Sequence, residues 1–178
     1  MNFASPNQAP RRNIELKARC RDLTKAAAAA RAVGASPTAV LNQLDTYFHC
    51  PNGRLKLREV DGRSAELIWY ARPDSTNFRG SDYYVVPITQ PAHAKSALTA
   101  ALGVRGEVRK RRELLLWHNV RIHLDRVDQL GDFVEFEAVI GPDDDEVTAH
   151  ERLATLTAAL SIQSADRVAV SYSDLLGL

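Results

Sequence analysis

The sequence predicts an α+β fold in which an antiparallel sheet packs against helices. The first observation is a set of segments that alternate polar and apolar residues, with the period of two that a half-buried strand produces. The second is a series of tight-turn sequences between these segments, such as Pro51–Gly53 and Asp61–Gly62. The third is a set of three segments with helical composition or spacing, which are available to cover the apolar side of the sheet.

The first predicted strand, Arg12–Arg21, alternates without a break. Its apolar face consists of Ile14, Leu16, Ala18 and Cys20, and its polar face carries Asn13, Glu15, Lys17, Arg19 and Arg21. Asp22 follows and can cap a helix over Leu23–Val33, which Gly34 ends. The Ser-Pro pair that comes next predicts a short turn or helix over Ser36–Leu44.

The remaining elements follow from the same two signals. Seven further strands are expected, at Asp45–His49, Arg54–Val60, Ser64–Arg72, Asp82–Ile88, Glu107–Trp117, Arg121–Val127 and Phe133–Ile140. Pro73–Gly80 is expected to be a polar loop, and Pro91–Leu102 an Ala- and Leu-rich helix. The acidic run Asp143–Glu146 starts a last helix, which reaches about Leu160, because carboxylates at a helix N-terminus complement its dipole.

Length and charge narrow the class of protein. We expect residues 1–10 to be disordered and residues 11–178 to form a single domain. A net charge of +1 gives no general signal for nucleic acid or membrane binding, so charge must act through local segregation. The first ten residues lack the apolar core of a signal peptide, and Cys20 lies on an apolar strand face, so a cytoplasmic protein with buried thiols is expected.

Charged residues gather on one face of the predicted strands. If the helices cover the apolar faces, the charged faces either meet solvent on an open sheet or line the interior of a closed barrel of about eight strands. Such an interior would hold nine cations and five acids, and the surplus predicts a polyanionic ligand. Three of the acids, Asp125, Glu135 and Glu137, cluster late in the chain, where carboxylates beside phosphate would hold Mg²⁺ or Mn²⁺.

The motifs resemble one known superfamily over nearly the whole chain. The NIELK of Asn13–Lys17 is similar to the ExExK motif of the CYTH superfamily, the triphosphate tunnel metalloenzymes, which includes class IV adenylyl cyclases and thiamine triphosphatases. Further similar motifs are NGRLKLRE at 52–59, AELIWYARP at 65–73, RKRRELLLW at 109–117, RIHLDRVDQLGDFVEFE at 121–137 and SYSDLL at 171–176. The resemblance implies an eight-stranded antiparallel closed barrel with helices packed outside. Within the superfamily, the motifs of this sequence are most similar to those of the class IV adenylyl cyclase-like branch.

The resemblance also implies roles for individual residues. The implied ligands of Mg²⁺ or Mn²⁺ are Glu15, Asp125, Glu135 and Glu137. The implied triphosphate-binding residues are Lys17, Arg19, Lys56, Arg58, Lys110, Arg112 and Arg121. Accessory residues are expected at Asn13, Arg54, Glu66, Tyr70, Arg72 and His123. Asn13 departs from the motif, since it replaces the first Glu and removes one charge from the metal site.

Three functions remain open at this stage. A metal-dependent phosphohydrolase needs only a positioned water, whereas a class IV-type adenylyl cyclase must also hold the ribose in line with the α-phosphorus. The visible residues bind phosphate and none reads adenine, so hydrolysis of a nucleoside, other organic or inorganic triphosphate is favoured. Cyclic AMP synthesis is the alternative, and a non-catalytic triphosphate-binding module is the third. We expect a small-molecule ligand, neither nucleic acid nor membrane, and a monomer or homodimer.

Overall fold

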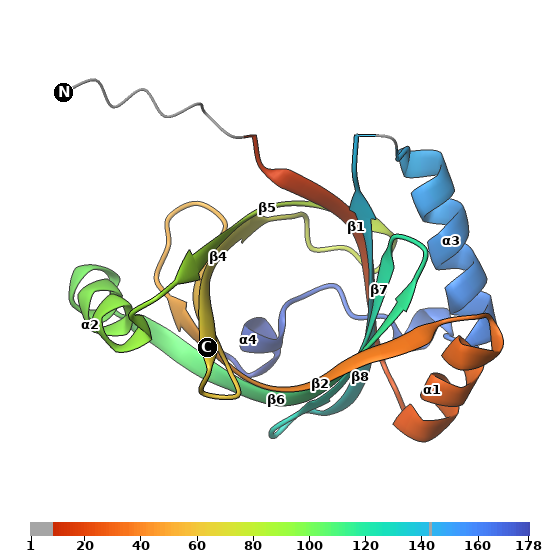
Figure 1. Ribbon diagram of the computed structural model, residues 1–178, viewed down its shortest axis with the longest axis horizontal. Coiled ribbons are helices and arrows are strands. Elements are labelled where there is room, and N and C mark those ends of the chain that lie inside the picture. The colour runs from red at the N-terminus through yellow and green to blue at the C-terminus, as the bar shows by residue number, and fades with distance from the viewer. Residues whose placement is uncertain (1–8, 143) are drawn as a thin grey trace.

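The chain folds into a closed eight-stranded antiparallel β-barrel with helices outside it, in a computed structural model that describes residues 9–142 and 144–178 (Figure 1). The strands are β1 Arg11–Arg19, β2 Ser36–Phe48, β3 Arg54–Val60, β4 Ser64–Ala71, β5 Arg79–Ile88, β6 Val104–Trp117, β7 Val120–Val127 and β8 Gly131–Ile140. Around the ring they follow the order β1-β5-β4-β3-β2-β6-β7-β8, and β1 closes the ring by pairing with both β5 and β8. The predicted fold class is therefore confirmed.

One predicted element is wrong. The segment Ser36–Leu44, expected as a turn or short helix, is the first part of the 13-residue strand β2. Strand β6 pairs with β2 from Ser36 to Phe48, and this long-range pairing overrides the local Ser-Pro signal. Pro37 is tolerated because it lies at the start of the strand, beside a register shift between Pro37 and Ala39.

Two strands begin earlier than the sequence predicts. Strand β5 starts at Arg79 and β6 at Val104, each three residues earlier than predicted. The early start of β5 places Arg79 in the barrel wall instead of the expected polar loop. Residues 1–8 of the predicted disordered segment, and Asp143 of the acidic run, lie outside the described residues.

The hairpin between β3 and β4 has the geometry that its sequence predicts. Asp61 and Gly62 both adopt positive φ, 50° and 64°, as the two central residues of a type I′ turn require. Asp61 is further held by its side chain, which accepts hydrogen bonds from the backbone and side-chain amides of Asn42. This turn fixes the β3–β4 register, which pairs Arg58 with Glu66 inside the barrel.

The helices cover the outer, apolar side of the barrel. Helix α1 (Leu23–Ala32) and helix α3 (Glu146–Ala159) pack against β1, β7 and β8, and α2 (Pro91–Leu102) packs against β2 and β3 (Figure 1). Asp22 caps α1 and Asp145 caps α3, each by accepting a backbone N–H three residues later. None of the helices in the described part of the chain is long and apolar enough to cross a membrane.

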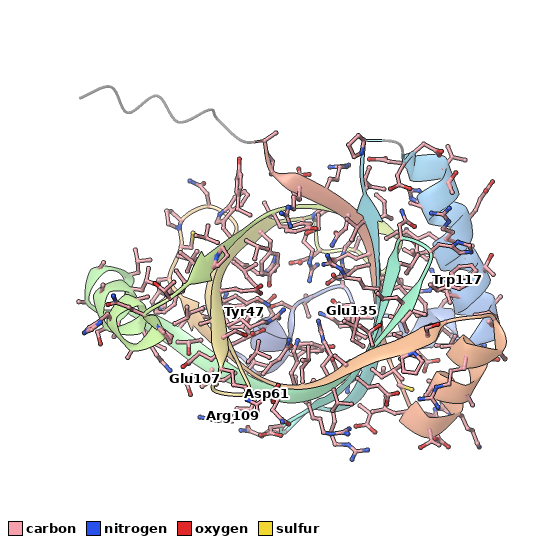
Figure 2. The ribbon with its side chains drawn as sticks, viewed as in Figure 1. Tyr47, Asp61, Glu107, Arg109, Trp117 and Glu135 are labelled. Atoms are coloured by element: carbon pink, nitrogen blue, oxygen red, sulfur yellow. The ribbon has the colours of Figure 1, made fainter. Side chains whose placement is uncertain are left out.

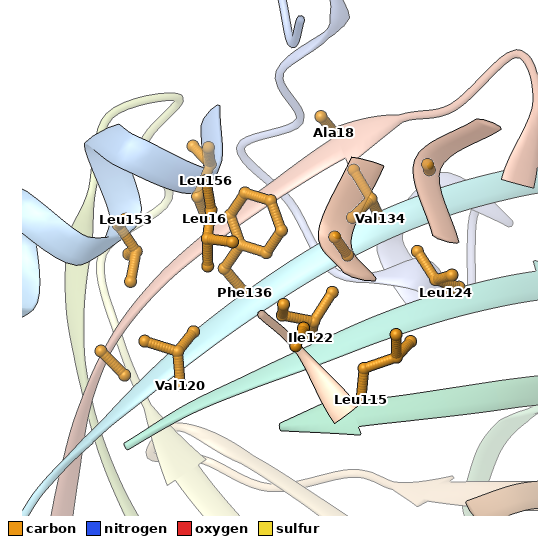
Figure 3. Packing of buried hydrophobic residues seen from close by; sticks show 14 of the residues in the cluster. Leu16, Ala18, Leu115, Val120, Ile122, Leu124, Val134, Phe136, Leu153 and Leu156 are labelled. Carbon is orange, nitrogen blue, oxygen red and sulfur yellow. The ribbon is translucent and has the colours of Figure 1, made fainter. Parts of the chain in front are cut away.

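The main hydrophobic core lies between the barrel and these helices (Figure 3). Leu16 and Phe136 point outward from neighbouring strands and meet Leu153 and Leu156 of α3, and all four are at most 1% exposed. Because the outward faces of β1, β7 and β8 supply this core, their inward faces are free to carry polar side chains. The fold therefore has its apolar core beside the barrel and a polar interior within it.

The C-terminal segment lies across one end of the barrel (Figure 1). Val168 donates its backbone N–H to the carbonyl of Lys17 at 2.9 Å, next to a bridge between Ala18 and Arg167. This contact lies between a 3₁₀ turn over Ser164–Asp166 and a short helix, α4 (Tyr172–Leu175). Tyr172 packs edge-to-face on Phe133 of the wall, with ring centroids 5.0 Å apart, so the segment that the sequence left without an element supplies a floor to the interior.

Candidate functional site

The barrel encloses a cavity of about 230 Å³ with a strongly charged wall. Eight Lys or Arg side chains and four Glu side chains are among the described residues that line it. In Figure 2, Tyr47 and Glu135 lie inside the ring, whereas Asp61 and Arg109 lie outside it. The wall includes most residues that the sequence suggested for a site, namely Glu15, Lys17, Lys56, Arg58, Glu66, Tyr70, Arg72, Lys110, Arg112, Arg121, Glu135 and Glu137.

The other suggested residues lie elsewhere. Arg19 is exposed, donates a hydrogen bond to the carbonyl of Leu130 at 3.4 Å and lies over the ring of Phe133. Arg54 pairs with Asp74 and with Asp174 of the C-terminal segment. The remaining three, Asn13, His123 and Asp125, are buried in the barrel wall beside the cavity. The structure thus brings together most of the suggested set and leaves Arg19 and Arg54 at the margin.

Two of the four suggested metal ligands are held by arginines. Glu15 Oε1 lies 3.0 Å from the Nε atoms of both Arg72 and Arg79. Burial raises the pKa of Glu15, and the nearby charge of Glu135 raises it further. The charges of Arg72 and Arg79 lower it, but they do not cancel the increase.

Asp125 accepts two hydrogen bonds of 2.6 Å from the Arg112 guanidinium and one of 3.0 Å from the Tyr172 hydroxyl. Burial alone would raise the pKa of Asp125, but the charges of Arg112 and Lys110 outweigh it and hold the pKa below its ordinary value. Asp125 is therefore a fixed anion that orients the Arg112 fork.

Two members of the charged network were missed from the sequence. Asp45 is 1% exposed and accepts hydrogen bonds from Lys56 at 2.9 Å and from Arg58 at 2.7 and 2.8 Å. Arg79 holds Glu15 and also donates to the carbonyls of Ser75 and Val168. Asp45 begins the predicted strand Asp45–His49, where too few residues alternate to assign its side chain to the interior, and Arg79 lies in the segment expected to be a polar loop.

Two lysines of the wall have strongly lowered pKa values. Burial and the neighbouring Arg112 lower the pKa of Lys110 to about 7, and burial with the neighbouring Arg58 lowers that of Lys56 to about 8. Asp125 and Asp45 oppose these shifts without cancelling them. At neutral pH Lys110 is therefore only partly charged, and an anion beside the two amines would favour the charged form of both.

His123, Glu135 and Glu137 form a compact group of metal-ligand types. One ligand atom from each lies within 4.8 Å of the other two. The Nδ1 atom of His123 is 3.6 Å from Glu135 Oε2 and 3.7 Å from Glu137 Oε1. Glu135 also contacts Lys17 at 3.2 Å, and these charges hold its pKa well below the ordinary value despite burial. Burial lowers the pKa of His123, which favours the neutral imidazole.

This group fits a divalent cation. Carboxylate oxygens and imidazole nitrogens are common ligands of divalent cations in proteins. The Nδ1 atom of His123 is buried and has no hydrogen-bond partner among the described residues, so a donor atom faces the carboxylates without another role. Asn13 is also buried, and its Oδ1 lacks a partner within the described part of the chain.

Comparison with known proteins gives one family. The family model described as the CYTH domain matches residues 11–172. No match was found among curated protein sequences.

Solved structures share the fold at low identity. The PH1012 protein of Pyrococcus horikoshii OT3 has a TM-score of 0.81 at 23% identity, covering 92% of this chain and 98% of that one. A provisionally assigned adenylate cyclase of Vibrio parahaemolyticus has a TM-score of 0.74 at 23% identity, covering 96% and 100%. The Hippeastrum protein HpAC1, described as having a dominant triphosphatase activity, has a TM-score of 0.65 at 14% identity, covering 92% and 93%. Likeness at these identities establishes the fold.

Proposed function

The chain belongs to the CYTH family, and from this premise we propose that it is a metal-dependent phosphohydrolase that cleaves a triphosphate held inside the barrel. CYTH proteins are in general triphosphate-acting metalloenzymes. The observation that carries the proposal is the cation surplus of the cavity wall, with eight Lys or Arg side chains against four Glu side chains. Asp45 and Asp125 lie behind this lining and pair with Arg58 and Arg112, so the cations outnumber the carboxylates by eight to six. Cations gathered around one cavity repel one another unless an anion lies between them, and a polyphosphate chain is an anion of matching shape and charge.

The phosphate-binding role falls to the cations that line the cavity. Six of the eight lining cations are assigned to it, namely Lys17, Lys56, Arg58, Lys110, Arg112 and Arg121. Asp45 holds Arg58 and Asp125 holds Arg112, so both guanidinium forks are fixed before any ligand arrives. Donors that are oriented in advance stabilise developing charge without reorganising during the reaction.

The cation-binding role falls first to Glu135 and Glu137. The pair lies on the inward face of β8 at a spacing of two residues, and both line the cavity beside Lys17 and Arg121. A divalent cation bound there would neutralise charge on the phosphate oxygens as the bond to the leaving group breaks. Glu15 and Asp125, which the resemblance also implies as ligands, would have to leave their arginine partners to reach the cation.

Cyclic AMP synthesis remains the second candidate function. Its support is the class IV-like motif set, together with the fold shared with the Vibrio parahaemolyticus protein. Hydrolysis is favoured because the cavity wall is suited to phosphate. The two lining tyrosines whose rings are of a kind that stacks on a base, Tyr47 and Tyr70, each already have the Lys56 amine 5.5 Å from their ring centroid.

The decisive experiment is a product assay on the purified full chain. Tripolyphosphate, thiamine triphosphate and ATP are each incubated with Mg²⁺ or Mn²⁺, and orthophosphate, pyrophosphate and cyclic AMP are separated. Release of orthophosphate that is lost in Glu137→Gln but kept in Glu113→Gln, a matched change outside the cavity lining, would support the proposal. Cyclic AMP with equimolar pyrophosphate would instead establish the cyclase, and tight ligand binding without any product would establish a binding module.

A further inference from the structure

We propose that His123 binds the catalytic cation directly, and that this nitrogen ligand makes the site prefer a first-row transition metal ion over Mg²⁺. The inference rests on the proposed function for the presence of a cation, and it adds the class of metal. It gives His123 a defined role, whereas the resemblance implied only carboxylates as ligands. A site of oxygen atoms alone would suit Mg²⁺, so the added nitrogen is the feature that decides selectivity.

The strand register brings His123 to the two carboxylates. His123 lies directly opposite Glu135 in the antiparallel β7–β8 pair, and Arg121, two residues earlier, lies opposite Glu137. Directly opposite residues on one face of such a pair have Cβ atoms about 4.5–5.5 Å apart. The β7–β8 pairing therefore holds the backbone of His123, Glu135 and Glu137 close together on one face of the sheet.

The distances fit a shared ion. Ligand atoms bound to one ion at about 2.0–2.2 Å lie about 3 to 4.3 Å apart, depending on the angle at the metal. The measured separations from His123 Nδ1 are 3.6 Å to Glu135 Oε2 and 3.7 Å to Glu137 Oε1. Both exceed an ordinary hydrogen bond and fall within the range for two atoms on the same ion.

Burial indicates that the Nδ1 atom has a partner yet to be bound. His123 is 4% exposed, and its Nδ1 atom has no hydrogen-bond partner among the described residues. Leaving a buried polar atom without a partner costs about 1–3 kcal/mol, so such atoms usually mark a bound water or ion. Since Nδ1 faces two carboxylate oxygens, a cation is the partner that this position favours.

The neighbouring charges explain why the metal class matters. Glu135 is shared with Lys17 at 3.2 Å and with Arg112 at 3.1 Å, which weakens it as a ligand for any cation. Asn13 is neutral where the resemblance implies a carboxylate. Mg²⁺ gives up its water ligands reluctantly and depends on anionic oxygen ligands. Mn²⁺ and Co²⁺ also bind imidazole nitrogen, and Co²⁺ binds it with higher affinity than Mn²⁺ does.

The first test is spectroscopic and needs no substrate. Mn²⁺ is added to the metal-free full chain, and pulsed electron paramagnetic resonance is used to look for the magnetic coupling between Mn²⁺ and a directly bound ¹⁴N nucleus. We expect this coupling in the wild-type protein. A bound Mn²⁺ without nitrogen coupling would overturn the proposal, whatever the variants do.

The second test compares affinities across metals and variants by calorimetry. His123→Gln should weaken Mn²⁺ and Co²⁺ binding by about tenfold or more, since even outer-shell changes cost 10–100-fold, and should remove the nitrogen coupling. Mg²⁺ binding should change by less than about threefold, because Mg²⁺ gains little from imidazole. His93→Gln, the same change at an exposed position on α2, is the matched control and should leave every affinity unchanged.

The outcomes separate this inference from the proposed reaction. Equal losses for all three metals in a folded His123→Gln protein would overturn the selectivity claim. If that variant does not fold, the wild-type spectrum still tests whether His123 binds the cation, and the wild-type ratio of Co²⁺ to Mg²⁺ affinity still tests the selectivity. A ratio near one would overturn the selectivity claim. A protein with nitrogen coupling that releases no phosphate from any triphosphate would uphold the metal site and overturn only the hydrolase.

Discussion

Raising the pH should weaken the binding of a triphosphate even though the ligand itself becomes more negative. The reason lies in Lys110, whose pKa is lowered to about 7 by burial and by the charges of Arg112 and Arg58 against Asp125 and Asp45. In the complex the anion favours the charged amine and returns its pKa toward the ordinary value of about 10.4. Above pH 7 the complex must therefore take up a proton that the free protein lacks.

The size of the effect follows from the two lowered pKa values. For each lysine that must be charged in the complex, the dissociation constant rises about tenfold for every pH unit above the pKa of the free protein. At pH 9 this gives about 100-fold for Lys110 and about tenfold for Lys56, with free-protein pKa values of about 7 and about 8. Together they predict a weakening of up to about 10³-fold between about pH 6.5 and about pH 9.

The assay is calorimetry of tripolyphosphate binding to the metal-free full chain across this pH range. Lys110→Arg keeps a charge that cannot be lost in the range and should flatten most of the dependence, provided that the variant melts cooperatively. Lys95→Arg, the same change on the exterior helix α2, should leave the wild-type slope intact. A wild-type dissociation constant that stays flat or falls toward pH 9 would refute this reasoning.

The stability of the free protein should change in the opposite direction. A lysine whose pKa is lower in the folded state binds fewer protons there than in the unfolded chain between the two pKa values. Its contribution is therefore destabilising below the folded pKa and fades as the pH rises toward the unfolded value of about 10.4. The stabilisation that tripolyphosphate adds to the melting temperature should shrink over the same range, so the two trends can be separated in one series of melting curves.

Three further changes, the last with a matched control, test other parts of the structure. Glu137→Gln should reduce metal-dependent turnover by about 100-fold or more while leaving the melting temperature within a few degrees, because the side chain is 19% exposed and its nearest cation is 3.8 Å away. Tyr172→Phe removes a buried 3.0 Å hydrogen bond to Asp125 and should lower the free energy of unfolding by about 1–2 kcal/mol in denaturant titrations. Gly53→Ala should lower it by about 1–3 kcal/mol, because its φ is 72° and a Cβ would lie 2.7 Å from a backbone oxygen of β4. Gly62→Ala, with a φ of 64° and nothing within 4 Å, should cost less, and an equal loss would contradict the steric argument.

The alternation of residues along the strands made the polar interior predictable. Lys17, Lys56, Lys110, Arg112 and Glu137 share polar strand faces, and all line the cavity. Strand alternation is a local property, so it can be read without knowing which strands are neighbours. The resemblance added the closure of the barrel, which the alternation alone left open between an open sheet and a ring.

The pairing of charges could not be predicted from the sequence, because it depends on register between distant strands. Lys17 lies opposite Glu135 in the β1–β8 pair, which joins the first and last strands of the barrel. Asp45 lies opposite Arg58 in the β2–β3 pair, and the alternation of either strand alone does not show that register. Tyr172 reaches Asp125 because the C-terminal segment docks across the barrel end, a tertiary contact with no local pattern.

The placement of the carboxylates explains how the barrel tolerates its surplus of positive charge without a ligand. Asp45 and Asp125 each stabilise an arginine, since their pKa values stay below the ordinary range and they remain ionised. The arginines cannot lose their protons, so the remaining repulsion falls on Lys56 and Lys110, whose amines can. Burial and the neighbouring arginines lower the pKa values of both amines, and a bound triphosphate would raise them again. Proton uptake on binding is therefore a direct consequence of building a phosphate site from fixed arginines and titratable lysines.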